Sequence, residues 1–475
     1  IEAIGEEGDS IEFTPLDPLI GWNGMLFNVG TGVSIFDYCV FEHSHCDISY
    51  GGGGAICAFM TEMHLNHCSF RDNSLVLSST TPFGGALVVY HTHDNFVVKD
   101  CEFKYNSSPV SGGAFLCWGA SPVIENCLFK GNYAYYGGGG IALYKGSHPQ
   151  ILNCDFIENH SDGGSGAIGI LELCNPEIIG CLIKDNSTAG SGGGIGSSDT
   201  CNPIIRNCII HGNTAQETGG GIALAYCGGI IEKCVIDSNT AVIRGGGIAC
   251  GPGTTIQIST CQITNNSTAG SGKGGGIAVR QSDPLIKNNT IAYNEAFAGG
   301  GILFYNSLNP EVLNSILWEN SAGEGNQVYL ESVSDDPGFT YCDIMGGQQA
   351  FGGTGAASYN GLYENNMDTL PFFANTSTGD YHLAWDSYPV VDPTRSPLID
   401  AGDPVFFFND PDGTRNDIGA YFFNQMPETP EAYDPPSWTT TSFTADWSSC
   451  CGALGYTLDV AYDTAFTNYV PGYEN

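Results

Sequence analysis

Hydrophobic and polar positions repeat along this chain with a period of about 27 residues. The repeat is easiest to follow from one small position, usually cysteine, which recurs eleven times. It is occupied by Cys39, Cys68, Cys101, Cys127, Cys154, Cys181, Cys208, Cys234, Cys261, Asn289 and Ser315. In every copy an apolar residue stands two positions after this anchor and another stands three positions before it. A fixed period of this kind predicts a repeat architecture with about eleven coils.

The spacing of these columns predicts short strands separated by bends. Residues two apart in a strand share a face, whereas residues three apart do not, so the chain must turn just before the anchor. A Gly-rich corner, such as 192–194 or 219–221, follows later in most copies. Asn and Gly tolerate the positive φ found at tight bends. Each coil is therefore predicted to hold three short strands, separated by a tight bend, an Asn bend and the Gly-rich corner.

Coils that keep one side chain at each position stack parallel strands about 4.8 Å apart. The sequence therefore predicts an all-β fold, a parallel β-helix or β-solenoid, over residues 1–334. A leucine-rich repeat is excluded because its Leu frame and helix-forming half are missing, and a propeller because its blades are longer.

An asparagine stands five residues after the anchor in ten of the eleven copies. These residues are predicted to form a structural ladder in which each side-chain amide bonds to the coils above and below it. The predicted ladder comprises Asn73, Asn106, Asn132, Asn159, Asn186, Asn213, Asn239, Asn266, Asn294 and Asn320.

The cysteine column has three interpretations. Buried free thiols are favoured, because cysteine is a small hydrophobe that suits a crowded interior column; disulfides and a metal site are the alternatives. A second, looser set follows the Gly-rich corners and consists of Cys57, Cys117, Cys174, Cys201, Cys227 and Cys250. The total of 19 is odd, so at least one thiol has no partner within the chain.

Charge narrows the range of functions. The chain has 51 Asp and Glu against 14 Lys and Arg, a formal net charge of −37. This balance excludes a nucleic-acid-binding protein, which needs a basic face, and disfavours an anionic membrane surface. No apolar run is long enough for a transmembrane helix.

Several of the few basic residues share one column, three residues after the anchor. This basic stripe consists of Arg71, Lys104, Lys130, Lys184 and His211. It could bind an anionic glycan or an acidic face of another copy, or the residues could simply pair with local carboxylates.

Residues 335–426 interrupt the repeat and carry several short acidic motifs. Asp410, Asp412 and Asp417, with Gly413 at a turn, could supply oxygen ligands to Ca²⁺. The alternative is a turn closed by an ion pair with Arg415. Both ends of the chain are almost purely acidic, which predicts that divalent cations stabilise them.

The coils resemble a known family. Residues 203–210, with Asn213 and the run at 219–223, are similar to bacterial secreted right-handed parallel β-helix proteins related to polymorphic outer-membrane repeats. Residues 396–404 and 417–421 resemble the segment that closes such helices. Residues 427–475 resemble the first part of a fibronectin type III β-sandwich, with Trp447 and Tyr456 in its core.

The resemblance implies a secreted protein, extracellular or on a bacterial cell surface. We expect a non-catalytic structural or adhesive β-solenoid that binds other copies, surface components or glycans and can form a filament or surface layer. The alternative is a carbohydrate-active enzyme, a polysaccharide lyase or glycoside hydrolase acting on acidic polysaccharide. A lyase site could be assembled from Lys104, Lys130, Glu102 and Glu125, although a solvated face would also carry such residues.

Overall fold

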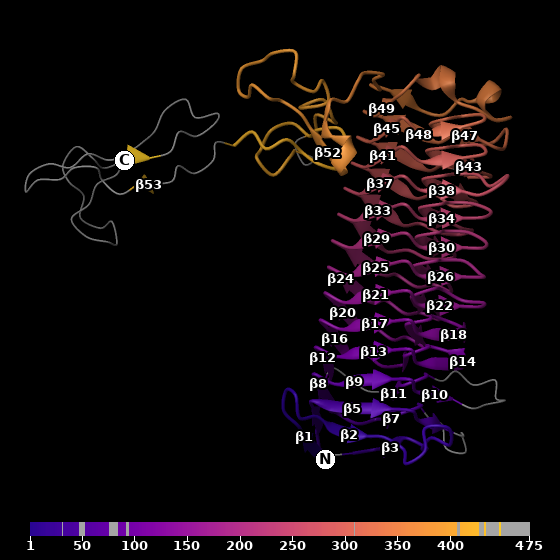
Figure 1. Cartoon of the computed structure of the whole chain (residues 1–475). Helices are drawn as coiled ribbons and strands as arrows, with labels where there is room; N and C mark the ends of the chain where they lie inside the picture. Colours follow the sequence, from indigo (N-terminus) through magenta and orange to yellow (C-terminus); the bar gives the residue numbers. More distant parts are fainter. Residues whose placement is uncertain are drawn as a thin grey trace, which may run out of the picture.

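The computed structural model describes residues 1–30, 32–46, 53–75, 84–91, 95–307, 309–405 and 409–426, together with the backbone of 432–433 and 446–447. Most of this chain forms a right-handed parallel β-solenoid of about twelve turns, which stands upright in Figure 1 with the N-terminus at its lower end. The predicted all-β solenoid is therefore confirmed.

Each complete coil contributes one strand to each of four parallel sheets, which we number 1 to 4 in chain order, whereas the coils at the two ends lack one or more of these strands. Sheet 1 contains β1 (Glu2–Ile4), β4 (Ser34–Asp37), β8 (Met63–Asn66), β12 (Phe96–Lys99), β16 (Val123–Glu125), β20 (Gln150–Leu152), β24 (Glu177–Ile179), β28 (Ile204–Arg206), β32 (Ile230–Glu232), β36 (Gln257–Ser259), β40 (Leu285–Lys287), β44 (Glu311–Leu313), β48 (Gly338–Thr340) and β50 (Tyr363–Glu364). Sheet 2 contains β2 (Ile11–Phe13), β5 (Cys39–Glu42), β9 (Ser69–Arg71), β13 (Glu102–Lys104), β17 (Leu128–Lys130), β21 (Asp155–Ile157), β25 (Leu182–Lys184), β29 (Ile209–His211), β33 (Val235–Asp237), β37 (Gln262–Thr264), β41 (Thr290–Ala292), β45 (Ile316–Trp318) and β49 (Asp343–Ile344).

The other two sheets complete the coil. Sheet 3 contains β6 (His45–Cys46), β10 (Ser74–Leu75), β14 (Ser107–Ser111), β18 (Tyr133–Tyr136), β22 (His160–Ser161), β26 (Ser187–Thr188), β30 (Thr214–Ala215), β34 (Thr240–Ala241), β38 (Ser267–Thr268), β42 (Glu295–Ala296) and β46 (Ser321–Ala322). Sheet 4 contains β3 (Met25–Asn28), β7 (Ile56–Phe59), β11 (Leu87–Tyr90), β15 (Phe115–Trp118), β19 (Ile141–Tyr144), β23 (Ile168–Ile170), β27 (Ile195–Ser197), β31 (Ile222–Leu224), β35 (Ile248–Cys250), β39 (Ile277–Arg280), β43 (Ile302–Tyr305) and β47 (Val328–Leu330).

The coil thus has four strands where the sequence pattern predicts three. The additional strand, in sheet 3, is mostly only two residues long and directly follows the ladder asparagine. A two-residue strand has no period-2 pattern of its own, so the sequence signal for it is absent. The parallel sheets also continue past residue 334 through β48, β49 and β50, which places the end of the coils inside the predicted closing segment.

Left-handed backbone positions make the bends. In one coil they lie at Asn153 (φ 51°), just before the anchor, at Glu158 (φ 57°) and, after sheet 4, at Glu172 (φ 57°). The ladder asparagine itself is not left-handed; the residue before it is. Asparagine is therefore required at that position for its amide group rather than for its backbone freedom.

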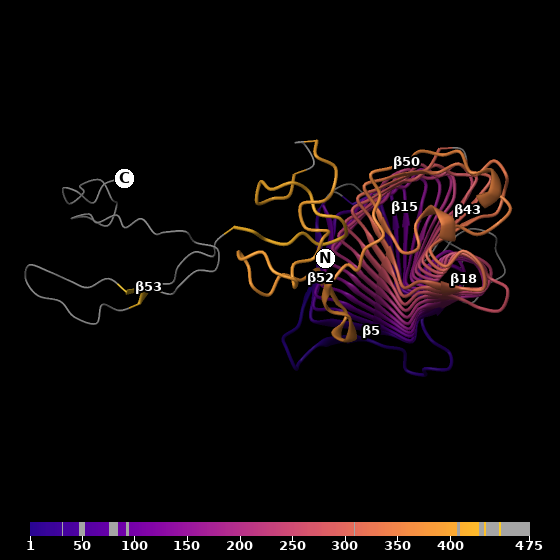
Figure 2. The same cartoon turned by 90° about the horizontal axis from the view of Figure 1, so that it is seen from above.

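The solenoid, whose coils are seen end-on in Figure 2, encloses one continuous apolar core along its axis. Identical positions stack from coil to coil, because the strands pair in register. The rings of Phe103, Phe129 and Phe156 lie nearly parallel with centroids 4.7–4.8 Å apart. Corners are equally crowded: a Cβ on Gly193 would lie 2.2 Å from the carbonyl oxygen of Gly220 in the next coil.

The remaining elements lie outside the parallel sheets. Three short 3₁₀ helices are η1 (Gln348–Ala350), η2 (Ala356–Ser358) and η3 (Thr376–Thr378), and β51 (Phe373–Asn375) pairs antiparallel with β52 (Asp380–Leu383). β53 (Ala432–Tyr433) and β54 (Asp446–Trp447) form a second antiparallel pair. The predicted fibronectin-like sandwich otherwise lies outside the described residues.

The segment after β50 folds back over the outer face of sheet 2 at the last coils, where β52 stands beside β41 and β45 (Figure 1). Trp385, Leu398 and Ile418 pack against Ile316 and Trp318. This small second core covers apolar side chains that would otherwise face water. The described part of the chain has no helix long and apolar enough to cross a membrane.

Candidate functional site

The asparagine ladder is internally complete. Asn159 Nδ2 donates to the Asn186 Oδ1 (2.9 Å) and to the backbone carbonyl of Phe129 (2.9 Å), and its backbone N–H donates to the same Asn186 Oδ1. Asn159 Oδ1 accepts the equivalent two bonds from Asn132. At the end of the ladder Asn320 donates to Gln327 Oε1, which takes the place of a further asparagine. The side-chain amides of the column, from Asn73 to Asn320, thus bond to groups within the protein.

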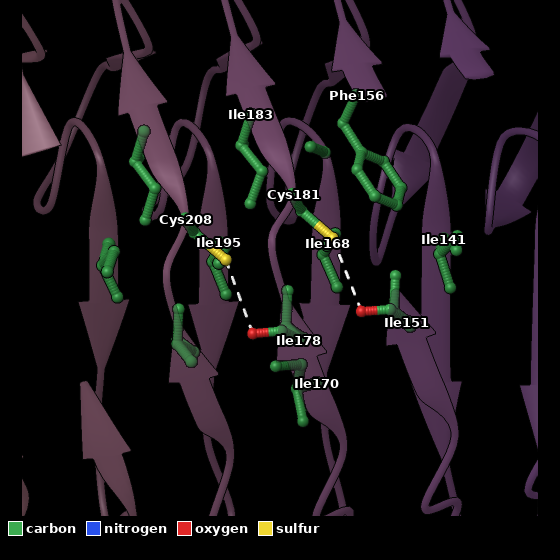
Figure 3. Close-up of a cluster of buried hydrophobic side chains, with 14 of the residues drawn as sticks. Ile141, Ile151, Phe156, Ile168, Ile170, Ile178, Cys181, Ile183, Ile195 and Cys208 are labelled. Carbon is green, nitrogen blue, oxygen red and sulfur yellow. Dashed lines mark hydrogen bonds between the residues drawn. The ribbon is translucent and has the colours of Figure 1, made fainter. Parts of the chain in front are cut away.

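The anchor cysteines point into the core and donate to the coil before. Cys181 Sγ lies 3.5 Å from the Ile151 carbonyl oxygen and Cys208 Sγ lies 3.4 Å from that of Ile178 (Figure 3). All 17 cysteines in the described part of the chain are buried, and none of them forms a disulfide. Burial raises the pKa of Cys342 to about 12, which keeps this thiol protonated and unreactive.

The second cysteine set divides into two structural groups. Cys57, Cys117 and Cys250 lie within strands of sheet 4. Cys174, Cys201 and Cys227 lie at the turn after sheet 4, where they form a second buried ladder. In that ladder Ser147 N–H donates to Cys174 Sγ and Cys174 N–H donates to Cys201 Sγ, both at 3.2 Å. These sulfurs accept backbone hydrogen bonds, as the ladder asparagines do.

The basic stripe is a true column on the outside of sheet 2, since Lys104 pairs in register with Arg71 and Lys130. However, every member has a carboxylate partner. The ion pairs are Arg71–Glu42 (2.6 Å), Lys104–Glu102 (2.6 Å), Lys130–Glu158 (3.6 Å), Lys184–Asp185 (3.7 Å) and His211–Asp237 (3.0 Å). The stripe therefore carries no excess of positive charge to attract an anionic partner.

The side chains considered for a lyase site do not converge. Glu102 pairs with Lys104 in the same strand, whereas Glu125 lies on sheet 1 and pairs with Lys99 at 3.1 Å. Lys130 is occupied by Glu158 from the following bend. Because each cation is paired with a local carboxylate, this set has the geometry of a solvated face.

The aspartates at 410–417 accept hydrogen bonds from the closing segment itself. Asp410 accepts from Asn416 Nδ2 and the Asp417 N–H, and Asp412 accepts from the Thr414 and Gln425 N–H groups. No group of three metal-binding side chains converges in the part of the chain that the structure describes.

The alternative interpretation, a turn closed by an ion pair between Arg415 and a carboxylate, is wrong. Arg415 donates to the backbone carbonyls of Gly402 (2.7 Å) and Ala401 (3.1 Å), and no carboxylate pairs with it among the described residues. The turn is closed by backbone groups. Desolvation by burial raises the pKa of Asp410 to about 6 and that of Asp417 to about 7.

A groove of about 1070 Å³ runs along the outer face of sheet 4. Its floor is a column of small residues, Gly196, Ala223, Ala249 and Ala278, paired in register from coil to coil. One wall is formed by the Gly-rich corners and the other by the turns that follow sheet 4. From the strand of Tyr144 to that of Arg280 there are five coil steps, or about 24 Å.

The two ends of the groove differ in chemistry. Tyr136, Tyr144 and Asp162 lie at one end. Hydrogen bonds from Tyr133 and His160 hold the pKa of Asp162 below its ordinary value. Arg244 and Arg280 lie at the other end, and both guanidinium groups lie over the ring of Tyr305.

Sequence reasoning missed this groove. In the sequence, each floor residue is the small residue that follows the first Ile of a strand from β27 to β39, as in Ile222-Ala223 and Ile248-Ala249. Because this small residue stands close to the Gly-rich corner, the sequence pattern alone assigns it to the turn. Only the strand assignment shows that its side chain points outward.

Comparison with known proteins gives one match. A family model described as a right handed beta helix region matches residues 20–156, 134–263 and 221–391, which overlap to cover most of the chain. No curated protein and no solved structure matches the chain.

Proposed function

The chain belongs to the right-handed β-helix family, and on this basis we propose that it is a non-catalytic structural and adhesive protein of the bacterial cell surface or the extracellular space. The observation that carries this proposal is the continuous satisfaction of the repeated polar residues. The Asn ladder and the paired basic stripe use their polar groups within the protein. A rod built in this way is stiff and positions surface groups at fixed spacing.

Stiffness follows from the way in which the coils are joined. Each coil contacts its neighbours through four parallel strands, one stacked core and a buried amide ladder. Bending the rod would separate several of these contacts at once, on one side of every coil. We infer that such a rod acts as a spacer or surface-layer component, either singly or joined to other copies in a filament.

A carbohydrate-active enzyme is the second candidate, and the groove on sheet 4 is the observation that favours it. Extended clefts suit polymer substrates, and Asp162 and Glu217 both line this one. An enzyme would require a general acid and base on both sides of one scissile bond.

Two measurements test the proposal. Electron microscopy of the purified chain should show rods, and incubation with acidic polysaccharides should produce no rise in absorbance from unsaturated uronates. Release of unsaturated products by the unmodified protein, with loss of that activity in an Asp162→Asn variant, would replace the proposal with the lyase alternative.

A further inference from the structure

We propose that the groove on sheet 4 binds the end of a glycan, an extended and mostly uncharged oligosaccharide whose terminal sugar carries one carboxylate. The proposal names the ligand class for the adhesive function above and therefore rests on it. It places the carboxylate at Arg244 and Arg280 and the neutral sugars along the floor toward Tyr144.

The positive end of the groove is a local exception in a strongly acidic protein. Glu331 is the shared partner of two cations, with Lys273 Nζ at 2.7 Å and Arg244 Nη2 at 3.7 Å. Arg280, which is exposed, adds a third positive charge beside them over the Tyr305 ring. Three cations thus lie around one directly paired carboxylate, with Glu217 one coil away, in a chain whose net charge is −37. An anionic group bound here would balance the remaining charge.

Arg244 also has unused hydrogen-bonding capacity. Its Nε is shielded from solvent and has no acceptor among the described residues. A buried donor without a partner costs free energy, and a guanidinium group binds a carboxylate through two parallel hydrogen bonds. The shielded Nε is out of reach of a groove ligand, so a ligand carboxylate would bind the part of the guanidinium group that remains exposed.

The rest of the groove does not suit a chain that is charged throughout. Arg244 and Arg280 are the only cations in the described lining. The acidic lining residues are Glu217, one coil before Arg244, and Asp162, two coils further toward the other end. A polyanion would place further carboxylates beside these two and would also be repelled by the whole molecule.

Neutral sugars do suit the remaining surface. Tyr136 and Tyr144 add two aromatic side chains to the lining, and the Tyr144 ring stacks on Trp118 at 5.8 Å, so the aromatic surface continues beyond the groove. The carboxylates of Asp162 and Glu217 can accept hydrogen bonds from sugar hydroxyls. Apolar surface with a few placed polar groups is typical of small-molecule sites.

The test compares xylopentaose with xylopentaose that carries one terminal glucuronic acid, by isothermal titration calorimetry at constant salt. We expect the acid-capped sugar to bind at least about tenfold more tightly, an effect of about 1.4 kcal/mol. Arg280→Ala should remove most of that difference. Arg206→Ala is the matched control, because Arg206 loses the same charge on sheet 1, away from the groove, and should leave binding unchanged.

A second variant tests the floor. Ala249→Phe places a ring in the groove and should weaken binding of both sugars, while circular dichroism and the melting temperature report whether the coil remains intact. If this variant does not fold, the comparison of Arg280→Ala with Arg206→Ala still decides the question.

Three results would overturn the proposal: equal affinity for the two sugars, no effect of Arg280→Ala, or tighter binding of tetragalacturonate or polyglutamate than of the acid-capped sugar. If xylopentaose and its capped form fail to bind but rods are seen and no unsaturated uronate is released, the structural function stands and only the ligand proposal fails. Release of unsaturated uronate would instead reject the non-catalytic function.

Discussion

At the scale of single residues, the chain uses a few side chains for the same task many times. Each ladder asparagine bonds to two backbone groups and to the side-chain amides of two neighbouring asparagines inside the core. Only asparagine and glutamine side chains carry both an NH₂ group and a carbonyl oxygen, and glutamine is one methylene longer. Cysteine stands where a small apolar side chain must also reach a carbonyl of the coil before. Because both side chains bond to fixed positions of an adjacent coil, these two residue types determine most of the register between coils.

Replacement of one ladder asparagine should be costly. In Asn159→Leu the Asn132 amide loses its acceptor, and the Phe129 carbonyl loses its donor, all within the buried core. Each buried group left unsatisfied costs about 1–3 kcal/mol, so we expect a loss of several kcal/mol in the free energy of unfolding. Denaturant titration measures this.

The control for that variant is Asn360→Leu, at an exposed position outside the ladder. It should change stability by no more than about 0.5 kcal/mol. If the two variants were equally stable, the ladder would be a packing feature without energetic weight.

The buried thiols make a second residue-scale prediction. Iodoacetamide added to the native protein should modify none of the 17 described cysteines, because all of them are buried. In guanidinium chloride the same residues should all react, as seen by mass spectrometry of peptides. Rapid native labelling of Cys181 would mean that the coils open locally.

At the scale of elements, the closing segment and β49 hold carboxyl groups in unfavourable surroundings. Desolvation by burial raises the pKa of Asp343 to about 7, and Asp343 Oδ2 has no hydrogen-bond donor among the described residues. Asp410 and Asp417 are raised in the same direction by burial. The last coils and the segment that covers them therefore hold these protons more tightly than the unfolded chain does.

Stability should fall as pH rises through the window between the unfolded and folded pKa values of these groups, from about 4 to about 7. In that window unfolding releases protons, so higher pH favours the unfolded state. Asp343→Asn cannot ionise and should melt at a higher temperature than the unmodified protein at pH 8, with little difference at pH 4.

The matched control is Asp386→Asn in the closing segment, where the side chain is exposed. Its melting temperature should follow that of the unmodified protein across the same pH range. A difference between Asp343→Asn and the unmodified protein that did not depend on pH would show that packing, and not ionisation, accounts for the effect.

At the scale of the whole molecule, net charge opposes compactness. A charge of −37 on one rod produces self-repulsion that salt screens over about 10 Å at 0.1 M. The paired basic stripe does not relieve it, since each of its cations is already matched. The expected consequence is a strong dependence of stability on ionic strength.

Raising NaCl from 20 to 500 mM should therefore raise the melting temperature by several degrees, as measured by calorimetry. Equal ionic strength from MgCl₂ distinguishes general screening from specific binding. A much larger rise with Mg²⁺ or Ca²⁺, reversed by a chelator, would support the divalent-cation sites predicted from the acidic ends.

The repeat itself could be predicted because nearly every coil shows the same spacing of anchor residue, apolar residues and ladder asparagine. The coil of Cys342 was missed, since it has no ladder asparagine to complete that pattern. The pairing of Lys130 with Glu158 could not be predicted, because the partner comes from a left-handed bend residue. The packing of Trp385 on Trp318 joins segments of different pattern, and the groove depends on which way a small residue points; neither leaves a periodic signal.

The in-register ladder has a consequence for how such a protein can change over generations. Loss of residues 155–181 would join Cys154 to Leu182 and bring Asn132 against Asn186, and each amide would find the same partners as before. Insertion of one coil would likewise leave the ladder hydrogen bonds of the two adjacent coils intact. The number of coils can therefore change over generations while the ladder re-forms on both sides, so the length of the rod can be selected without breaking the ladder.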